Sequence, residues 1–289
     1  MRTFGSAVLA LAALVLAGIA LPGAWIDRNI VQVDGFVELA GPLGADPEFQ
    51  AELTTALATE VTANAGLPDA LSNIVEPLIA DAAANVTALP GYPAAWDETL
   101  RRSHNLSFPI NADLATGVDS PQPLRLDLAP VVALALQEVG SGIGIDVPAP
   151  AETLVDIGSP AQQEALSQLK AVSGGWPVLA IGAVVAALTA LVLARRRGTA
   201  LALIGLGSAV LGGLFWAGAR TAPEVLERMR AETGTTESSI SGLFQDGLVA
   251  RFTASGEPLA LAVVGVGVVL LVSGAAVRLI GGGTRQRMG

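Results

Sequence analysis

The chain has 289 residues, of which 52% are hydrophobic, 15% charged and 4% aromatic, and this composition is too apolar for an ordinary soluble domain. The absence of cysteine excludes disulfide frameworks, thiolate metal sites and cysteine nucleophiles, and the single histidine excludes a metal site built from several histidines of one chain. A formal net charge of −10 argues against a nucleic-acid partner, because affinity for phosphate backbones comes mainly from Lys and Arg.

Four windows without any Asp, Glu, Lys, Arg or His account for the apolar excess. They are Phe4 to Leu21, Trp176 to Ala194, Thr199 to Ala219 and Leu259 to Val277. Because about 20 apolar residues cross the hydrocarbon core of a bilayer as a helix, each window is long enough, or nearly so for the first, to span a membrane. We therefore predict an all-α membrane protein with four transmembrane helices.

The first span leaves an alternative open. Arg2, the apolar stretch and the small residues from Gly18 to Ala20 also resemble a secretory signal peptide that is cut after Ala20. Leu21 and Pro22 would follow the cut, and a proline beside a cleavage site is unfavourable. We therefore favour an uncleaved signal anchor.

The charge distribution predicts which side of the membrane each segment faces. Arg2, the turn Arg195 to Arg197 and the tail after the fourth span hold seven positive residues and no acidic ones. Residues 24–175 hold 20 acidic and five basic residues, and residues 220–257 hold six and four. Because Lys and Arg near span ends stay in the cytoplasm, we expect cytoplasmic termini and two extracytoplasmic acidic segments.

This topology divides the chain into eight segments. Trp25, Trp176 and Trp216 fall at the expected outer ends of spans, where indole rings favour the headgroup layer. The expected segments are a first transmembrane helix (1–22), a mainly helical extracytoplasmic domain with a short strand (23–175), a second transmembrane helix (176–194), a cytoplasmic Arg-rich turn (195–198), a third transmembrane helix (199–219), an extracytoplasmic helical loop (220–257), a fourth transmembrane helix (258–278) and a cytoplasmic tail (279–289).

Helix caps and the helical spacing of apolar residues predict several helices in the large outer segment. Asp46-Pro47-Glu48 gives a cap, a proline at the first helical position and an early acid, and it predicts a helix that ends near Gly66. Helices are also expected over 68–89, 93–105, 129–139 and 159–172. The expected core face contains Phe49, Leu53, Leu57, Leu71, Ile74, Val75, Leu78, Trp96, Leu100, Val132 and Leu136.

Between these helices, Leu124 to Leu128 alternates with period two and predicts a short, half-buried strand. Residues 111–122 are expected to form turns, Gly140 to Gly144 to end the preceding helix, and Val147 to Pro150 to be extended.

The short outer segment carries an amphipathic face of its own. This face could pack on the large domain or lie on the membrane. We favour packing, because Arg251 is the only nearby basic residue and membrane-surface helices have a Lys/Arg-rich polar face. The face consists of Ile240, Leu243, Phe244, Leu248 and Phe252, ahead of Gly256 and Pro258.

The helix over 93–105 carries a candidate interaction site made of Trp96, Asp97, Arg101 and His104. Ser103 and His104 are sequence neighbours and do not face each other on a helix, so a nucleophile–base pair is not expected. We interpret His104 as a capping or core residue, and we expect no catalytic, cofactor-binding or metal-binding residue.

Small residues on the spans predict close helix contacts. Gly182, Ala186, Ala190 and Ala194 form one ridge, and Ser208 with Gly212 forms another. Such ridges predict a compact bundle or a contact between two copies of the chain. The expected partners are thus the lipid bilayer and a protein partner or second copy, with no cofactor and no nucleic acid. The absence of ionisable side chains in the spans disfavours ion-coupled transport by this chain alone.

Several features occur together in this chain: Trp25 at the end of a span, Asp46-Pro47 at a helix start, Trp96 through His104 on one helix, Leu124 to Leu128, and the turn Arg195 to Arg197. This layout resembles a family of uncharacterised actinobacterial integral membrane proteins. The resemblance covers about the first 220 residues, rests on short structural motifs, and implies an envelope protein without an assigned activity.

The sequence therefore favours a multi-pass cell-envelope protein that binds, scaffolds or senses through its acidic extracytoplasmic domain without catalysis. One alternative is a component of a transport or signalling membrane complex, which would need a water-filled path between spans for transport. Another is an extracytoplasmic hydrolase, which would need Asp97, His104 or neighbouring acids to converge in a cleft.

Overall fold

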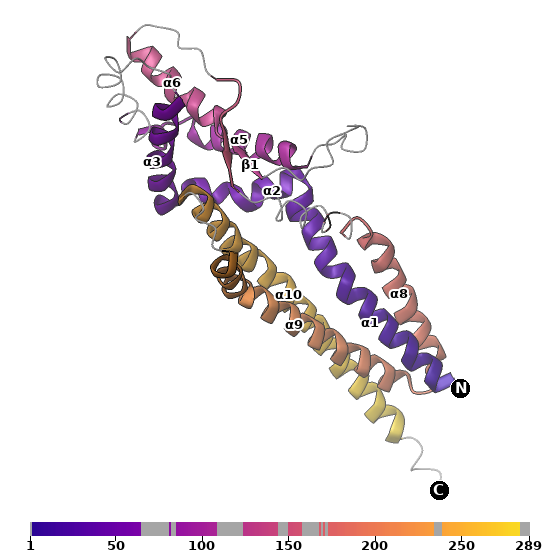
Figure 1. The fold of residues 1–289 in the computed structure, drawn as a ribbon. Coiled ribbons are helices and arrows are strands. Elements are labelled where there is room, and N and C mark those ends of the chain that lie inside the picture. Colours follow the sequence, from indigo (N-terminus) through magenta and orange to yellow (C-terminus); the bar gives the residue numbers. More distant parts are fainter. Residues whose placement is uncertain are drawn as a thin grey trace. The chain divides into compact units, whose positions relative to one another are not determined.

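The computed structural model describes residues 2–64, 81, 85–108, 124–143, 150–157, 168, 170, 173–233 and 239–283. Within these ranges the chain is mostly helical and contains one two-stranded sheet (Figure 1). It divides into two compact units. Unit 1 comprises Met1–Arg28, Leu169–Arg228 and Phe252–Gly289, and unit 2 comprises Asn29–Gln168 and Met229–Arg251.

Unit 1 is built from four long apolar helices. They are α1 (Arg2–Ile26), α8 (Trp176–Leu193), α9 (Arg197–Thr233) and α10 (Ser239–Gly283), and the parts of α9 and α10 within Met229–Arg251 belong to unit 2. Each contains a stretch that is long and apolar enough to cross a membrane. Among the described residues, every large exposed apolar side chain except Leu106 lies on these helices. The chain thus has the composition of a multi-pass membrane protein.

Two helices continue past the expected ends of their spans. α1 runs through Pro22 to Ile26, and α10 is continuous through Pro258, the expected start of the fourth span, so the membrane boundaries of these spans stay a prediction. A proline inside a helix removes one backbone hydrogen bond and crowds the preceding turn. Neighbouring helices make such prolines tolerable in spans, so the residue type alone does not end these helices.

Helix α1 packs along α8 through the small-residue ridge expected on the second span (Figure 1). A Cβ atom on Gly182 would lie 3.4 Å from Leu16 Cδ1, and Ala190 is fully buried. The Ser6 hydroxyl donates a hydrogen bond of 2.8 Å to the Ala190 carbonyl. This ridge is therefore used inside the chain, and a contact between copies through it stays a prediction.

Helices α9 and α10 approach each other along small residues spaced seven apart. A Cβ atom on Gly205 would lie 2.6 Å from the Gly267 carbonyl oxygen, and a Cβ atom on Gly267 would lie 2.7 Å from the Gly205 carbonyl oxygen. Any side chain here would therefore collide with the facing backbone. A repeat of seven keeps these residues on one line along both helices, which we call the glycine seam. The seam consists of Gly198, Gly205 and Gly212 on α9 and of Ala260, Gly267 and Gly274 on α10.

Helix α1 also contacts α9. The Leu14 side chain fills the space above Gly207, and a Cβ atom on Gly18 would lie 3.3 Å from Leu211 Cδ2. An apolar pocket of about 240 Å³ remains between α1, α9 and α10. Its lining residues are Gly18, Leu21, Pro22, Leu211, Gly212, Leu214, Phe215, Leu259 and Val263.

Unit 2 is built from short helices and a small sheet. Strand β1 pairs antiparallel with β2, with Leu126 opposite Val155. The elements, of which η1 begins at the end of unit 1, are the π-helix η1 (Asp27–Val31), α2 (Val33–Ala40), the 3-10 helix η2 (Gly41–Ala45), α3 (Pro47–Asn64), α5 (Tyr92–Ser107), β1 (Arg125–Asp127), α6 (Ala129–Ile143) and β2 (Leu154–Asp156).

The local expectations that fall on described residues of unit 2 agree with these elements. The Asp46 carboxylate caps α3 by accepting the N–H groups of Glu48 at 3.0 Å and Phe49 at 3.3 Å, as its sequence predicts. Helix α6 passes through Gly140 and ends at Ile143, within the stretch Gly140 to Gly144 that was expected to end it; a single glycine weakens a helix without ending it. The helices expected over 68–89 and 159–172, the turns over 111–122 and the extended stretch Val147 to Pro150 lie wholly or largely outside the described residues.

One hydrophobic core joins both segments of unit 2. Phe244 of α10 is buried in it, and Ser241 and Gln245 donate hydrogen bonds of 3.0 Å and 2.8 Å to the Ile157 carbonyl. Leu243, Phe244 and Leu248 of the amphipathic face therefore pack on the large segment, whereas Phe252 contacts Trp25 of unit 1. The side chain of Ile240 lies outside those described. Of the expected core residues, Phe49, Leu53, Trp96, Leu100 and Val132 are buried and Leu136 is partly buried, whereas the side chains of Leu57, Leu71, Ile74, Val75 and Leu78 lie outside those described.

Candidate functional site

Helix α5 is the element on which the expected site depends, and its two faces differ in character. It begins after Gly91 with Pro93 in its first turn, where the missing N–H costs no helical hydrogen bond. One face is buried in the core of unit 2, and the other presents charged side chains. The buried face carries Tyr92, Trp96, Thr99, Leu100, Ser103 and His104, and the charged face carries Asp97, Glu98, Arg101 and Arg102.

His104 is a buried residue, with 5% of its surface exposed. Its Nε2 lies 3.0 Å from the carbonyl oxygen of Ile30 in η1. Because a carbonyl only accepts hydrogen bonds, Nε2 carries the hydrogen. The ring also lies between Phe36 and Phe108, at centroid distances of 5.3 Å and 4.7 Å. This histidine thus ties α5 to η1, in agreement with the interpretation of His104 as a core residue.

Trp96 also belongs to the core, with 1% of its surface exposed. Its ring packs against the backbone of Gly44, where a Cβ atom would lie 2.7 Å from the indole Nε1. Phe49 makes an edge-on contact with the indole at a centroid distance of 5.2 Å. The tryptophan is therefore an anchor of the core and is not accessible to a partner.

Asp97 and Arg101 lie on the charged face of α5. Arg101 Nη1 donates a hydrogen bond of 2.9 Å to the carboxylate of Asp34 in α2, and both side chains are well exposed to solvent. The structure therefore separates the four expected residues into a buried pair and an exposed pair. An interaction site remains a prediction for the exposed pair.

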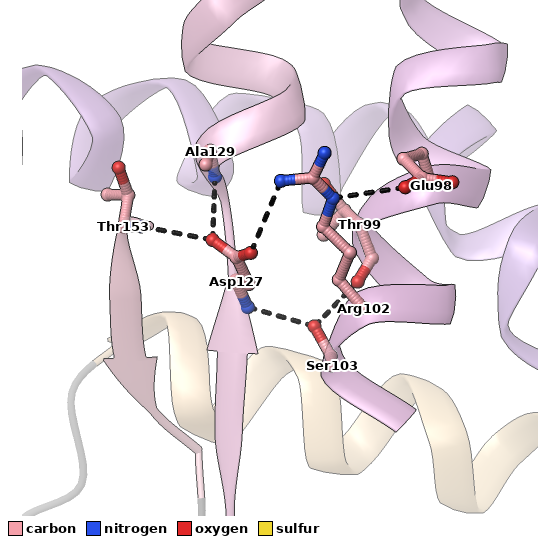
Figure 2. A network of polar contacts seen from close by, with 7 residues as sticks. All are labelled: Glu98, Thr99, Arg102, Ser103, Asp127, Ala129 and Thr153. Carbon is pink, nitrogen blue, oxygen red and sulfur yellow. Dashed lines mark hydrogen bonds and ion pairs between the residues drawn. The ribbon is translucent and has the colours of Figure 1, made fainter. Parts of the chain in front are cut away.

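A buried carboxylate that the sequence analysis did not single out organises unit 2 (Figure 2). Asp127, at the end of β1, has 3% of its surface exposed. Its Oδ1 accepts hydrogen bonds from the N–H groups of Ala129 at 3.1 Å and Thr153 at 3.0 Å. The first bond lies at the N-terminus of α6, where the helix dipole favours a negative charge. One carboxylate thus joins the starts of α6 and β2.

Helix α5 reaches the same carboxylate from its charged face. Arg102 Nη1 lies 3.8 Å from Asp127 Oδ2, and Arg102 Nε donates a hydrogen bond of 3.0 Å to Glu98 (Figure 2). The Ser103 hydroxyl donates to the Thr99 carbonyl at 2.6 Å and accepts the Asp127 N–H at 2.8 Å. The serine hydrogen is therefore already engaged by a carbonyl, which provides no base. This network fixes α5 to the sheet and has the character of a structural tie.

A signal for Asp127 was present in the sequence. An acid followed closely by a proline at a helix start occurs twice, at Asp46-Pro47 and at Asp127 with Pro130. From the sequence only Asp46 is readily interpreted as a cap, because Asp127 also fits the alternation of the strand. Its second partner, Thr153, is far away in sequence, and only the fold brings it close.

Three polar atoms on the buried face of α5 have no hydrogen-bond partner among the described residues: the Tyr92 hydroxyl, the Trp96 indole N–H and the Thr99 hydroxyl. Burial raises the pKa of Tyr92 from 10.0 to about 12, because the charged phenolate loses its hydration. Within the described ranges, no group of three or more His, Asp or Glu side chains is arranged to hold a metal ion.

Comparison with known proteins finds no family model, no curated protein and no solved structure that matches the chain. The resemblance to the actinobacterial membrane family therefore stays a prediction.

Proposed function

We propose that the chain is a multi-pass envelope membrane protein whose unit 2 is an extracytoplasmic domain that binds a protein partner without catalysis. The observation that carries this proposal is the shared core of unit 2, in which Phe244 from the short acidic segment packs with Phe49 from the large one. Two segments with a common core lie on the same side of a membrane. The charge distribution assigns both of them to the outer side independently.

The geometry of unit 2 supports binding over hydrolysis. The Ser103 hydroxyl donates to a backbone carbonyl, as His104 Nε2 does, and Asp127 accepts backbone N–H groups. These are the side chains that a nucleophile, a base and an orienting acid would use, and each is occupied with holding the fold. The charged face of α5, by contrast, is exposed and carries both signs of charge, which suits a polar partner surface.

The topology can be tested directly, because the chain has no cysteine background. Single variants Asp97→Cys, Asp246→Cys and Arg196→Cys place a thiol in each acidic segment and in the Arg-rich turn. In intact cells, a membrane-impermeant maleimide should label the first two, and it should label Arg196→Cys only after permeabilisation. Labelling of the turn alone in intact cells would overturn the proposed orientation.

The binding role can be tested by photo-crosslinking in membranes. A photoreactive amino acid at Asp97 should give a discrete adduct of fixed mass, whereas the same amino acid at Glu138, an exposed acid on α6, should not. A second copy of this chain in the adduct would identify a homo-oligomer and still support a binding role. The uncrosslinked chain alone at position 97 would count against this face of α5 as the interface.

A further inference from the structure

One end of unit 1 concentrates positive charge from different helices. Arg195 and Arg196 form the turn after α8, Arg197 begins α9, and all three are exposed. The glycine seam brings the C-terminal part of α10 to the same place, since a Cβ atom on Gly198 would lie 3.0 Å from the backbone nitrogen of Arg278. Arg278 is exposed as well. We call these four residues the arginine cluster.

The arginine cluster has no counter-charge in the part of the chain that the structure describes. None of its four guanidinium groups makes an ion pair with a described carboxylate, and the first turn of α9 contains no acidic residue. A helix N-terminus carries a partial positive charge and is normally flanked by acids. Arginines at the start of α9 therefore add positive charge where a helix already favours an anion, and an anion from outside the chain would relieve the repulsion.

Apolar side chains next to the arginine cluster show which kind of anion fits. Val192 and Leu193 precede the turn, and Val277 and Leu279 flank Arg278, all of them exposed. The charged groups thus lie at the end of apolar, membrane-length helices, at the depth of lipid headgroups. A phospholipid matches both parts, with its phosphate against the guanidinium groups and its acyl chains against the valines and leucines.

We infer that the arginine cluster is a binding site for anionic phospholipids, which it recognises through their phosphate groups. The inference rests on membrane insertion of the four helices and is independent of the binding role proposed for unit 2. Because Arg presents several N–H donors in a planar fork, it can hold one phosphate through two hydrogen bonds. Four such groups from two helix ends provide charge that a zwitterionic headgroup cannot neutralise.

The test uses the full chain in mild detergent, in which membrane orientation plays no part. Phosphatidylglycerol and phosphatidylcholine with the same acyl chains are titrated separately, and bound lipid is counted by native mass spectrometry. We expect tighter binding of phosphatidylglycerol, by roughly fivefold for each arginine engaged, and a preference that shrinks at high salt. Equal binding of both lipids by the folded wild type would overturn the inference.

Variants locate the site. Arg278→Gln should lower the affinity for phosphatidylglycerol by roughly fivefold, whereas Arg228→Gln, which removes one exposed arginine elsewhere on α9, should leave it unchanged. Replacing Arg195, Arg196 and Arg197 together by Gln should reduce the preference to the roughly fivefold effect of Arg278, and replacing them by Lys should retain most of it. Equal losses in Arg278→Gln and Arg228→Gln would show a general charge effect and contradict a defined site.

A competition experiment distinguishes a lipid ligand from a soluble anion. Inorganic phosphate, added in excess over phosphatidylglycerol, should compete only weakly, because it lacks the acyl chains that contact the apolar side chains beside the arginine cluster. Complete displacement of the lipid by inorganic phosphate would overturn the lipid assignment in favour of a soluble phosphate ligand.

Discussion

The two units of this molecule are held together by opposite means. In unit 1, α9 and α10 meet backbone to backbone along the glycine seam, where five of the six residues are glycine and the sixth is alanine. In unit 2, the largest side chains of the core, including Trp96 and Phe244, fill the space between elements, and a buried carboxylate ties the elements together. Lipid surrounds apolar side chains as favourably as protein does, so spans gain from close backbone contact, whereas a domain in water gains from burying large side chains.

The strongest test of this contrast removes side-chain volume from unit 2. Trp96→Ala should lower the free energy of unfolding of unit 2 by about 3–5 kcal/mol, because it leaves a large cavity beside Gly44 and Phe49. Leu106→Ala, on the exposed face of the same helix, should change it by less than about 0.5 kcal/mol. Thermal unfolding in mild detergent measures the loss, and limited proteolysis shows whether cleavage begins within unit 2. Cleavage that begins in α8 or α9 instead would contradict independent cores.

The complementary test adds volume to unit 1. Gly205→Leu should lower the free energy of unfolding of unit 1 by about 3 kcal/mol or more, because the new side chain meets backbone atoms of Gly267 and Leu271 that cannot move aside individually. Gly213→Leu is the matched control on the same helix, since no atom lies within 4 Å of its Cβ position. The control should be neutral or stabilising, as Leu has a higher helix propensity than Gly. Equal melting temperatures for both variants would show that the close approach contributes nothing.

Elements of this fold are predictable from the sequence where the pattern that indicates them is local, within one stretch of residues. Elements that depend on a partner far away in the sequence are not. The four spans were predictable because about 20 apolar residues without charge form a long, local pattern. The capped start of α3 and the strand at β1 were predictable for the same reason. Strand β2 was not, because three residues, Leu154–Asp156, give too short a pattern without their partner.

The candidate site shows the same limit. Helical spacing correctly placed Trp96 and His104 on one face of a helix, and that face proved to be buried. Spacing cannot tell whether the face meets a core or a partner, which depends on residues such as Gly44 and Ile30 far away in the sequence. Of the glycine seam, the sequence predicts only Gly212, in a ridge with Ser208, because glycines at a spacing of seven produce no hydropathy contrast.

A smaller effect is expected at the polar tie of unit 2. Asp127→Ala leaves the N–H groups of Ala129 and Thr153 without their acceptor, so the free energy of unfolding should fall by about 2–3 kcal/mol. Asp156→Ala removes an exposed carboxylate that pairs with Arg125 at 3.4 Å, and it should cost less than about 1 kcal/mol. Chemical denaturation in detergent compares the two variants. Similar losses of unfolding free energy in the two variants would mean that the buried Asp127 carboxylate stabilises the fold no more than the exposed Asp156 carboxylate does.

The smallest expected effect on stability concerns Tyr92, the only tyrosine of the chain, and it is seen only at alkaline pH. Its pKa is raised to about 12 in the folded protein against 10.0 ordinarily, so above pH 10 the unfolded chain loses the phenolic proton first. The contribution of Tyr92 to stability should therefore be complete below pH 10 and be lost as the pH rises toward 12. Phenolate absorbance measures this group alone, and Tyr92→Phe should remove its share of the alkaline destabilisation without weakening the fold at pH 7, because the hydroxyl has no partner among the described residues. A phenolate that forms near pH 10 in the folded protein would show that the hydroxyl is hydrated and that the core of unit 2 is open to water beside Tyr92.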